Sequence, residues 1–251
     1  MDQKTLAYIN MYAVLGRLRE LCELSEEARN ILGEQRMDLG ISVSGGPSAM
    51  LRFDNGHVTM VDGVESSEIL LKFSSPEKFN GMIDGTVTPF PRKGFMKIGF
   101  LLKKFTKLTD LLARYLRPTE EDLRDEEFFT VSTRLMFHVI AEAAAQVGNF
   151  DKIGTFSADW TVDGNIRLAI LPDGPEAYLA VKDHHFTAVH EKCPDPMSSM
   201  EFVGYHNARD LFDGKVGAFP LICDGNLLMK GMISQLDNFN RILSRVALYL
   251  G

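Results

Sequence analysis

The feature that most constrains the fold is an internal repeat. Residues 69–91, ILLKFSSPEKFNGMIDGTVTPFP, align with residues 198–220 without a gap. Because this register is shared over the whole stretch, two diverged copies of one unit explain it better than chance matching of apolar positions. The matched pairs include Phe73 with Phe202, Asp84-Gly85 with Asp213-Gly214, Val87 with Val216, and Phe90-Pro91 with Phe219-Pro220.

The repeat continues on both sides of this stretch, so it predicts two units of the same strand order, over 41–116 and 170–250. Backwards, with the same offset, the matched pairs are Ile41 with Ile170, Gly45 with Gly174, and Asp54 with Asp183. Forwards, after a two-residue insertion in the second copy, they are Gly94 with Gly225, Met96 and Ile98 with Leu227 and Met229, and Leu108, Leu111 and Leu112 with Phe239, Ile242 and Leu243.

The second copy ends in a recognisable order of elements. A short strand around 200–202 leads to ARDLFDGKVGAF, and GNLLMKG then forms a second strand. A long amphipathic helix follows, because its apolar residues recur at i, i+3, i+4 and i+7. These residues are Met232, Ile233, Leu236, Phe239, Ile242, Leu243, Val246 and Leu250.

This order resembles the C-terminal half of the sterol carrier protein-2 (SCP2) family, and the repeat extends the resemblance to 41–116. The resemblance implies two tandem SCP2-like domains. In that family the same pieces close a lipid tunnel, so the resemblance also implies an apolar cavity. The matching motifs are apolar positions and a few glycines, and they carry no catalytic signature.

Hydrophobic periodicity and turn residues predict the elements of the first copy. Asp54-Asn55-Gly56 is a hairpin signal, because Asn and Gly tolerate positive φ. Helices are expected over 4–23, from Ser25 to near Gly33, over 79–83 and over 101–116. Strands are expected over 40–44, 49–53, 57–61, 69–73 and 95–98.

Pro118 and the acidic stretch after it indicate a boundary, so the expected domains are 1–117 and 118–251. Thr119 with Asp122 is a capping pair for a helix over 128–147, which Gly148-Asn149 ends. Strands are then expected over 166–171, 178–181, 186–190, 200–202 and 226–230. The predicted fold class is α+β, with a mostly antiparallel five-stranded sheet covered by helices on one face in each copy.

Composition excludes several classes of protein. The chain is 45% hydrophobic and 24% charged, which is typical of a globular domain, and it has no apolar run long enough for a membrane span. The net charge of −7 argues against general nucleic-acid binding. The N-terminus has no secretory pattern and the C-terminus has no peroxisomal signal. Three scattered cysteines indicate reduced thiols, so a cytoplasmic location is expected.

Two patterns suggest chemistry but have simpler explanations. Ser42, in GISVSGG, lacks the second glycine of a nucleophile elbow, and Pro47 and a strand follow it instead of a helix. His184 and His185 fall in a hairpin turn, and His190 lies along the returning strand, too far to share an ion with them. We therefore expect no catalytic residue, metal or cofactor.

An apolar pocket is the remaining candidate site. Twelve Met and 17 Phe suit such a pocket, since Met adapts to irregular shapes. The inward positions implied by the resemblance are Phe73, Phe90, Met96, Ile98 and Phe105 in copy one, and Phe202, Leu211, Phe212, Phe219, Leu227, Met229, Met232, Leu236 and Phe239 in copy two. For any one of them, ordinary core packing is the alternative.

Three functions remain open. The first is non-catalytic binding or transfer of a fatty-acyl, sterol-like or quinone-type lipid. The second is an accessory module with filled cores that serves a larger enzyme, as domains of the resembled family often do. The third, an enzyme, has the least support in the sequence.

A basic block distinguishes copy one from copy two. Between Arg92 and Arg117 the only acidic residue is Asp110, whereas the matching part of copy two mixes both signs. The helix that begins GFLLKKF places Lys103, Lys104 and Lys107 beside apolar residues, a pattern typical of contact with anionic headgroups or an acidic partner. The alternative is a solvated helix face neutralised by the acidic run 120–127.

Overall fold

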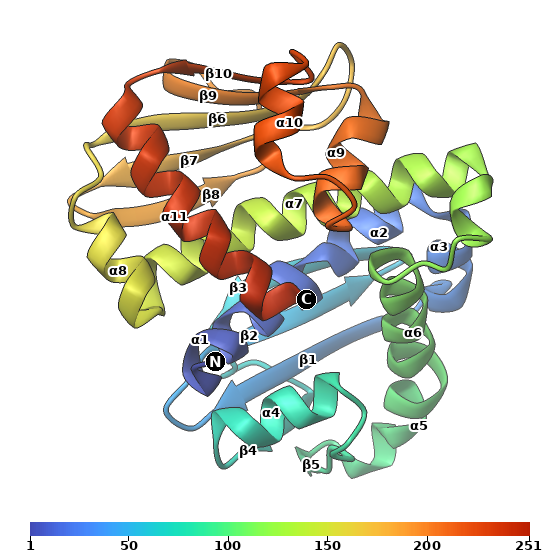
Figure 1. The fold of residues 1–251 in the computed structure, drawn as a ribbon. Helices are drawn as coiled ribbons and strands as arrows, with labels where there is room; N and C mark the ends of the chain where they lie inside the picture. The colour runs from blue at the N-terminus through green and yellow to red at the C-terminus, as the bar shows by residue number, and fades with distance from the viewer. The chain divides into compact units, whose positions relative to one another are not determined.

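The computed structural model describes residues 1–251, and the chain divides into two compact units, Met1–Leu123 and Arg124–Gly251. The division falls shortly after the boundary expected at 117/118. Figure 1 shows the elements of each unit in chain order. None of the helices combines the length and apolar character that crossing a bilayer requires.

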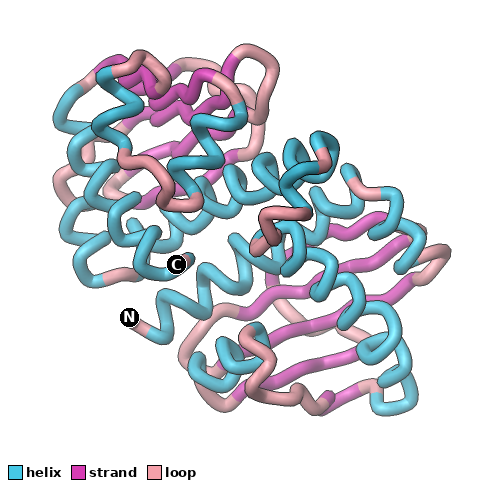
Figure 2. The backbone as a smooth tube through the Cα atoms, turned by 45° about the vertical axis from the view of Figure 1, so that its right-hand side comes forward, coloured by secondary structure: helices cyan, strands magenta, loops and turns pink.

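Each unit contains one five-stranded sheet, and the two sheets have the same order of strands. The orders are β3-β2-β1-β4-β5 and β8-β7-β6-β9-β10. In each sheet the central pair, β1 with β4 or β6 with β9, is parallel, and the other three pairs are antiparallel. The sheets are therefore mixed, which corrects the expectation of a mostly antiparallel sheet, because β1 with β4 and β6 with β9 run parallel. The repeated strand order predicted from the sequence is confirmed. Figure 2 shows the helices packed against each sheet.

The helical elements of the first unit are α1 Gln3–Tyr8, the π-helical η1 Ile9–Val14, the 3₁₀ turn η2 Leu15–Arg17, α2 Leu18–Leu24, α3 Glu26–Leu32, α4 Pro76–Ile83, the 3₁₀ turn η3 Phe95–Lys97, α5 Ile98–Phe100, the π-helical η4 Leu101–Phe105, α6 Thr106–Leu116 and the 3₁₀ turn η5 Asp122–Arg124 at the boundary. Its strands are β1 Arg36–Val43, β2 Ser48–Asp54, β3 His57–Asp62, β4 Ile69–Phe73 and β5 Pro91–Lys93.

Local chemistry explains where these elements begin and end. Ser25 Oγ accepts a hydrogen bond from Ala28 N and begins α3, and Gly33 ends it with a positive φ. Asn55 and Gly56 both have positive φ, so they form the tight turn expected between β2 and β3. The core lies between the sheet and the last helix, where the ring of Phe53 packs 5.0 Å from that of Phe100 and 6.4 Å from that of Phe105.

The second unit has helices α7 Glu126–Phe150, α8 Lys152–Ala158, α9 Tyr205–Phe212, α10 Ala218–Cys223 and α11 Ile233–Leu250. Its strands are β6 Gly164–Leu171, β7 Glu176–Lys182, β8 His185–Val189, β9 Pro196–Val203 and β10 Leu227–Gly231. The cap of α7 is Asp125, which accepts from Phe128 N, whereas Thr119 and Asp122 bond to each other. The predicted cap and the predicted end at Gly148-Asn149 are therefore both wrong.

Gly148 and Asn149 have a different role, which is to hold the edge strand β8. A side chain at Gly148 would press on the ring of Phe186, so glycine lets α7 approach the strand closely. Asn149 accepts from Phe186 N at 2.9 Å and donates to Phe186 O at 2.8 Å. The open edge of the sheet is thus paired by a side chain, which blunts its capacity to bind another strand.

The predicted fifth strand at 95–98 is wrong: β5 is Pro91–Lys93, and a helical turn follows it. The glycine matching was also wrong. A Cβ at Gly94 would overlap Glu68 O, and a Cβ at Gly231 would overlap Met197 O, at the same point of each sheet. Gly94 therefore corresponds to Gly231, whereas Gly225 precedes β10 and lies in open space.

Candidate functional site

The apolar face of the sheet in the second unit is formed by alternate residues of β9 and β10. In their antiparallel register Leu227 lies opposite Phe202, and Met229 lies opposite Met200. Because successive side chains of a strand point to opposite faces, these four share one face. Three of them are buried, and Met229 is half-buried.

Two helices cover this face, and Figure 1 shows α11 running across the strands. The ring of Phe212 on α9 meets the ring of Phe202 edge-on, with 5.5 Å between their centroids. On α11, Leu236 and Phe239 are three residues apart and both buried, so they lie on the side of the helix that faces the core. Leu211, next to Phe212, is half-buried.

The structure thus brings seven predicted residues into one region of the second unit, and we call them the apolar layer. Whether the apolar layer binds a ligand stays a prediction. Its members are Phe202, Leu211, Phe212, Leu227, Met229, Leu236 and Phe239.

Two other predicted residues, Phe219 and Met232, are not inward. Phe219 belongs to α10, and its side chain is 76% exposed. The helix forms because Pro220 sits in its first turn, where a missing N–H costs nothing. Met232 caps α11 and is exposed, with its backbone bonded to the Ser198 hydroxyl.

In the first unit the predicted residues divide in the same way. Phe73 and Phe105 are buried, and the ring of Phe73 packs 5.4 Å from that of Phe79. Phe90, in the connection before β5, is exposed, and so are Met96 and Ile98, because the segment 95–98 expected to be a strand is helical and turns these two side chains outward.

One polar residue beside the apolar layer was missed by the sequence reasoning. Gln235 is fully buried next to Leu236, and its Nε2 donates to Val162 O at 2.9 Å. Its Oε1 atom is buried and accepts no hydrogen bond. Such an atom is costly to leave unpaired. The available signal was a glutamine inside the apolar stripe of the helix.

The opposite face of the same sheet is held by charges. Arg167 on β6 bonds Glu176 on β7 at 2.7 Å and Glu201 on β9 at 2.6 Å, and Glu201 also bonds Lys230 on β10 at 2.9 Å. The hydrogen bond from Arg167 holds the pKa of Glu176 below its ordinary value. This face is therefore polar and stabilises the order of the strands.

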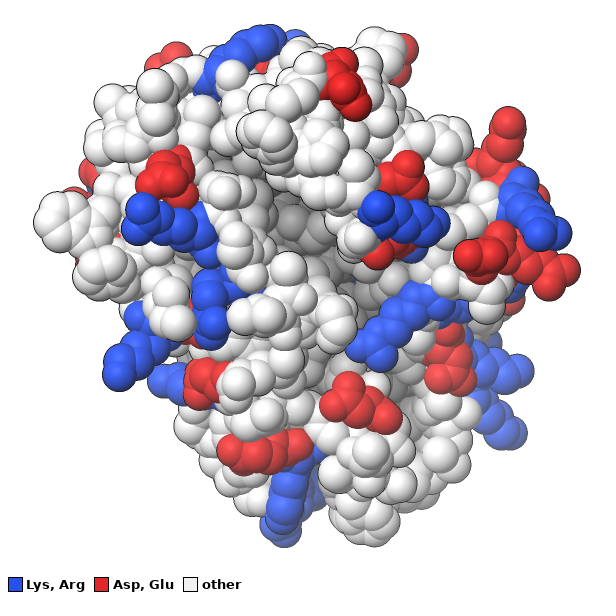
Figure 3. Space-filling view, in the orientation of Figure 1, with Lys and Arg blue, Asp and Glu red and all other residues white.

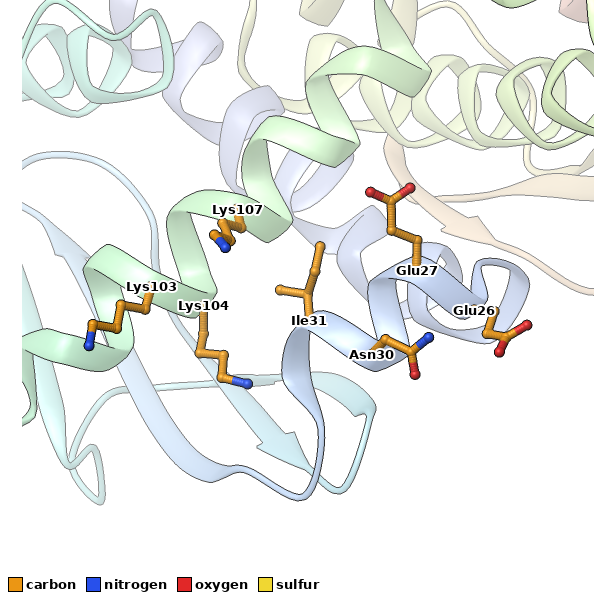
Figure 4. A pocket seen from close by; sticks show the side chains of 7 residues that line it. All are labelled: Glu26, Glu27, Asn30, Ile31, Lys103, Lys104 and Lys107. Carbon is orange, nitrogen blue, oxygen red and sulfur yellow. The ribbon is translucent and has the colours of Figure 1, made fainter.

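The first unit has an open cleft of about 680 Å³, most of whose lining residues are charged. Figure 4 shows Lys103, Lys104 and Lys107 on the η4–α6 helix, with Lys104 extended toward α3 and Lys103 directed away from it; α3 supplies the remaining lining residues. Lys104 Nζ lies 3.3 Å from Leu32 O. The residues from α3 are Glu26, Glu27, Asn30 and Ile31.

The residues considered for chemistry have structural partners. Ser48 Oγ lies 3.1 Å from Ser42 Oγ across the β1–β2 pair. Asp183 and His184 form the turn between β7 and β8, and His190 Nε2 lies 3.3 Å from Glu142 Oε2 on α7. The structure gathers no group of three His, Cys, Asp or Glu side chains that could hold a metal ion.

No family model and no curated protein matches the sequence. Among solved structures, one named "UbiJ-SCP2 Ubiquinone synthesis protein" is 15% identical, covers 43% of this chain and 95% of its own, and has a TM-score of 0.33. A sterol carrier protein 2 structure is 18% identical, covers 44% and 92%, and has a TM-score of 0.34. The apo form of sterol carrier protein 2 from Yarrowia lipolytica is 19% identical, covers 41% and 92%, and has a TM-score of 0.32. The chain is similar to these SCP2 structures over part of its length.

Proposed function

We propose that this protein binds or transfers a hydrophobic small molecule of the fatty-acyl, sterol-like or quinone class without catalysing a reaction on it. The second unit would hold the ligand between the inner face of β9–β10 and α11. The observation that carries the proposal is that the apolar layer is only partly buried. Leu211, Phe212 and Met229 are only half-buried, and exposed Met232 and Ile233 adjoin the layer at the turn from β10 to α11.

A ligand entering at this edge would remove apolar surface from water on both partners. Such burial contributes about 25 cal/mol per Å², or about 0.8 kcal/mol per methylene group. The seven side chains of the apolar layer carry no nucleophile and no general base, so the layer suits binding rather than reaction. The unpaired Gln235 Oε1 would accept a hydrogen bond from a ligand hydroxyl or a protonated carboxyl group.

The test is native mass spectrometry of the protein purified without detergent, combined with titration of a fluorescent fatty acid. A co-purified lipid mass, together with saturable uptake of the probe, supports carriage. A clean apo mass with no uptake would contradict it and would instead support the accessory module with filled cores.

A further inference from the structure

The first unit presents an apolar surface to solvent on the segment that follows β5. Phe95, Ile98 and Leu102 lie at i, i+3 and i+7 of the helical stretch 95–105, so they share one side of it. Their side chains are 51%, 37% and 65% exposed, respectively. The exposed ring of Phe90 packs 5.3 Å from that of Phe95 and extends the same surface. We call these four residues the exposed apolar face.

This face is not part of the core. The core contacts of the same helical stretch come instead from Phe100, Leu101 and Phe105, which are buried. The stretch includes the π-helical turn η4, whose open carbonyl at Leu101 is satisfied by Thr106 Oγ1 at 2.9 Å. A surface helix normally turns polar residues to solvent. Here the solvent side is apolar as well, which marks a contact surface.

Cations border the exposed apolar face, and several of them are not neutralised. Lys97 is paired with Glu68 at 2.6 Å, and Lys93 donates to Ser67 O. Lys103 and Lys107 form no ion pair, and Lys104 bonds only the Leu32 carbonyl. In the view of Figure 3, Lys and Arg side chains lie along the α6 side of the first unit, with acidic side chains among them. The acidic run 120–127 contacts this helix through the ion pair of Asp122 with Arg114, at 2.6 Å.

The second unit does not repeat this arrangement. Its last helix also begins with an exposed apolar residue, Ile233, but the next exposed charges are Asp237 and Arg241, which pair with each other at 2.9 Å. The repeated fold therefore does not require a surface that is both apolar and basic. The surface that is both apolar and basic therefore depends on residues that are particular to the first unit.

We propose that the first unit docks on a lipid bilayer that carries anionic headgroups. Phe90, Phe95, Ile98 and Leu102 enter the boundary between headgroups and acyl chains, and Lys103, Lys104 and Lys107 contact lipid phosphates and carboxylates. Charge favours this occupant, because lysines without an acidic partner and exposed apolar residues lie on the same helical segment, a combination typical of segments that bind anionic membranes. The proposal does not depend on a ligand in the second unit.

The first experiment is co-sedimentation with vesicles of phosphatidylcholine alone and of phosphatidylcholine with phosphatidylserine. We expect binding only to the anionic vesicles, and we expect it to weaken as salt rises from about 0.05 M to about 0.5 M, because salt shortens the reach of the lysine charges. Lys103→Glu with Lys107→Glu should weaken binding by about 25-fold or more, since each lysine near an anionic surface is worth about fivefold. The control, Lys152→Glu with Lys182→Glu, makes the same change in charge on exposed lysines of the second unit and should bind as the wild type does.

The second experiment locates the contact. The single tryptophan, Trp160, lies in the second unit and is 68% exposed, so it senses any contact made there. In a Trp160→Phe background, the indole introduced by Leu102→Trp should shift its emission to the blue on anionic vesicles, while Trp160 of the wild type should not shift. Binding to neutral vesicles alone, no loss in the Lys103→Glu, Lys107→Glu variant, or a shift confined to Trp160 would overturn the proposal. Absence of vesicle binding at low salt would also overturn the proposal and would favour an acidic protein as the partner of this surface.

Discussion

Tyr249 donates its hydroxyl hydrogen to Asp151 Oδ2 over 2.6 Å, and this contact joins the last turn of α11 to the start of α8. Arg245, one turn earlier on α11, pairs with the same carboxylate at 3.0 Å. Asp151 also caps α8 by accepting from Ile153 N and Gly154 N. A single buried carboxylate therefore fixes the position of α11, the helix that covers the apolar layer, relative to α8.

Asp151→Asn should destabilise the second unit by about 2–4 kcal/mol, because it leaves Arg245 without its counter-charge. Burial raises the pKa of Asp151, but the hydrogen bonds from Arg245, Tyr249 and two backbone N–H groups outweigh it and lower the pKa to about 2. The pKa of an unfolded Asp is about 3.9. The carboxylate thus stabilises the fold above about pH 4, and this contribution is lost as the pH falls through about 2.

Urea unfolding at pH 6, and again near pH 3 and pH 2, checks this prediction. The difference between wild type and Asp151→Asn should shrink as the pH falls. The matched control is Asp237→Asn, which breaks an exposed ion pair on the same helix and should cost less than about 1 kcal/mol. Equal losses for the two variants at pH 6 would contradict the role assigned to Asp151.

The correspondence of Gly94 with Gly231 leads to a second prediction. Both have positive φ, and a Cβ on either would overlap a backbone carbonyl, that of Glu68 or that of Met197. Gly94→Ala and Gly231→Ala should therefore cost more than the roughly 1–2 kcal/mol of a left-handed alanine. Gly225 also has positive φ but lies in open space, so Gly225→Ala should cost no more than that amount. Urea midpoints of the three variants decide the order, and a larger loss at Gly225 would restore the original alignment.

The order of strands was predictable from the sequence, and the fifth strand was not. The repeat carries the order, because matched apolar positions and turn residues specify the same pairing twice. The error at 95–98 arose because four residues with three apolar side chains fit a strand and a helix equally well. Matching Gly94 with Gly225 by sequence spacing added to this error, because α10 lengthens the second copy ahead of β10. Only the backbone contact at Gly94 and Gly231 identifies the true pair.

The candidate site was predictable in part for a related reason. Residues in regular strands and in long helices, such as Phe202, Leu227 and Phe239, lie inside, because periodicity fixes which face they occupy. Phe90, Met96 and Phe219 lie in short connecting segments, where no period specifies a side. Their apolar character alone did not show that they face solvent.

A third prediction concerns the thiols. Burial raises the pKa of Cys22 to about 12 and also raises the pKa of Cys193, whereas Cys223 on α10 is exposed. Because the thiolate is the reactive form, Cys223 should react rapidly with a disulfide reagent at pH 8, and the other two should react only on unfolding. Cys223→Ser should remove the rapid phase and leave the slow one. Two rapid thiols in the native protein would show that a region around Cys22 or Cys193 opens readily.

The last prediction separates a binding site from a packed core in the second unit. Met229 and Leu228 are neighbours on β10 and both are half-buried, but Met229 points to the apolar layer and Leu228 points to the charged face. Met229→Trp should reduce uptake of a fluorescent fatty acid by about tenfold or more, because the indole occupies the space that the ligand would use. It should cost less than the 1–3 kcal/mol typical of adding bulk to a well-packed core. Leu228→Trp adds the same side chain on the other face and should leave uptake unchanged. If Met229→Trp instead lowers stability by several kcal/mol while uptake in the wild type is absent, the apolar layer is filled core and the accessory function becomes the better explanation.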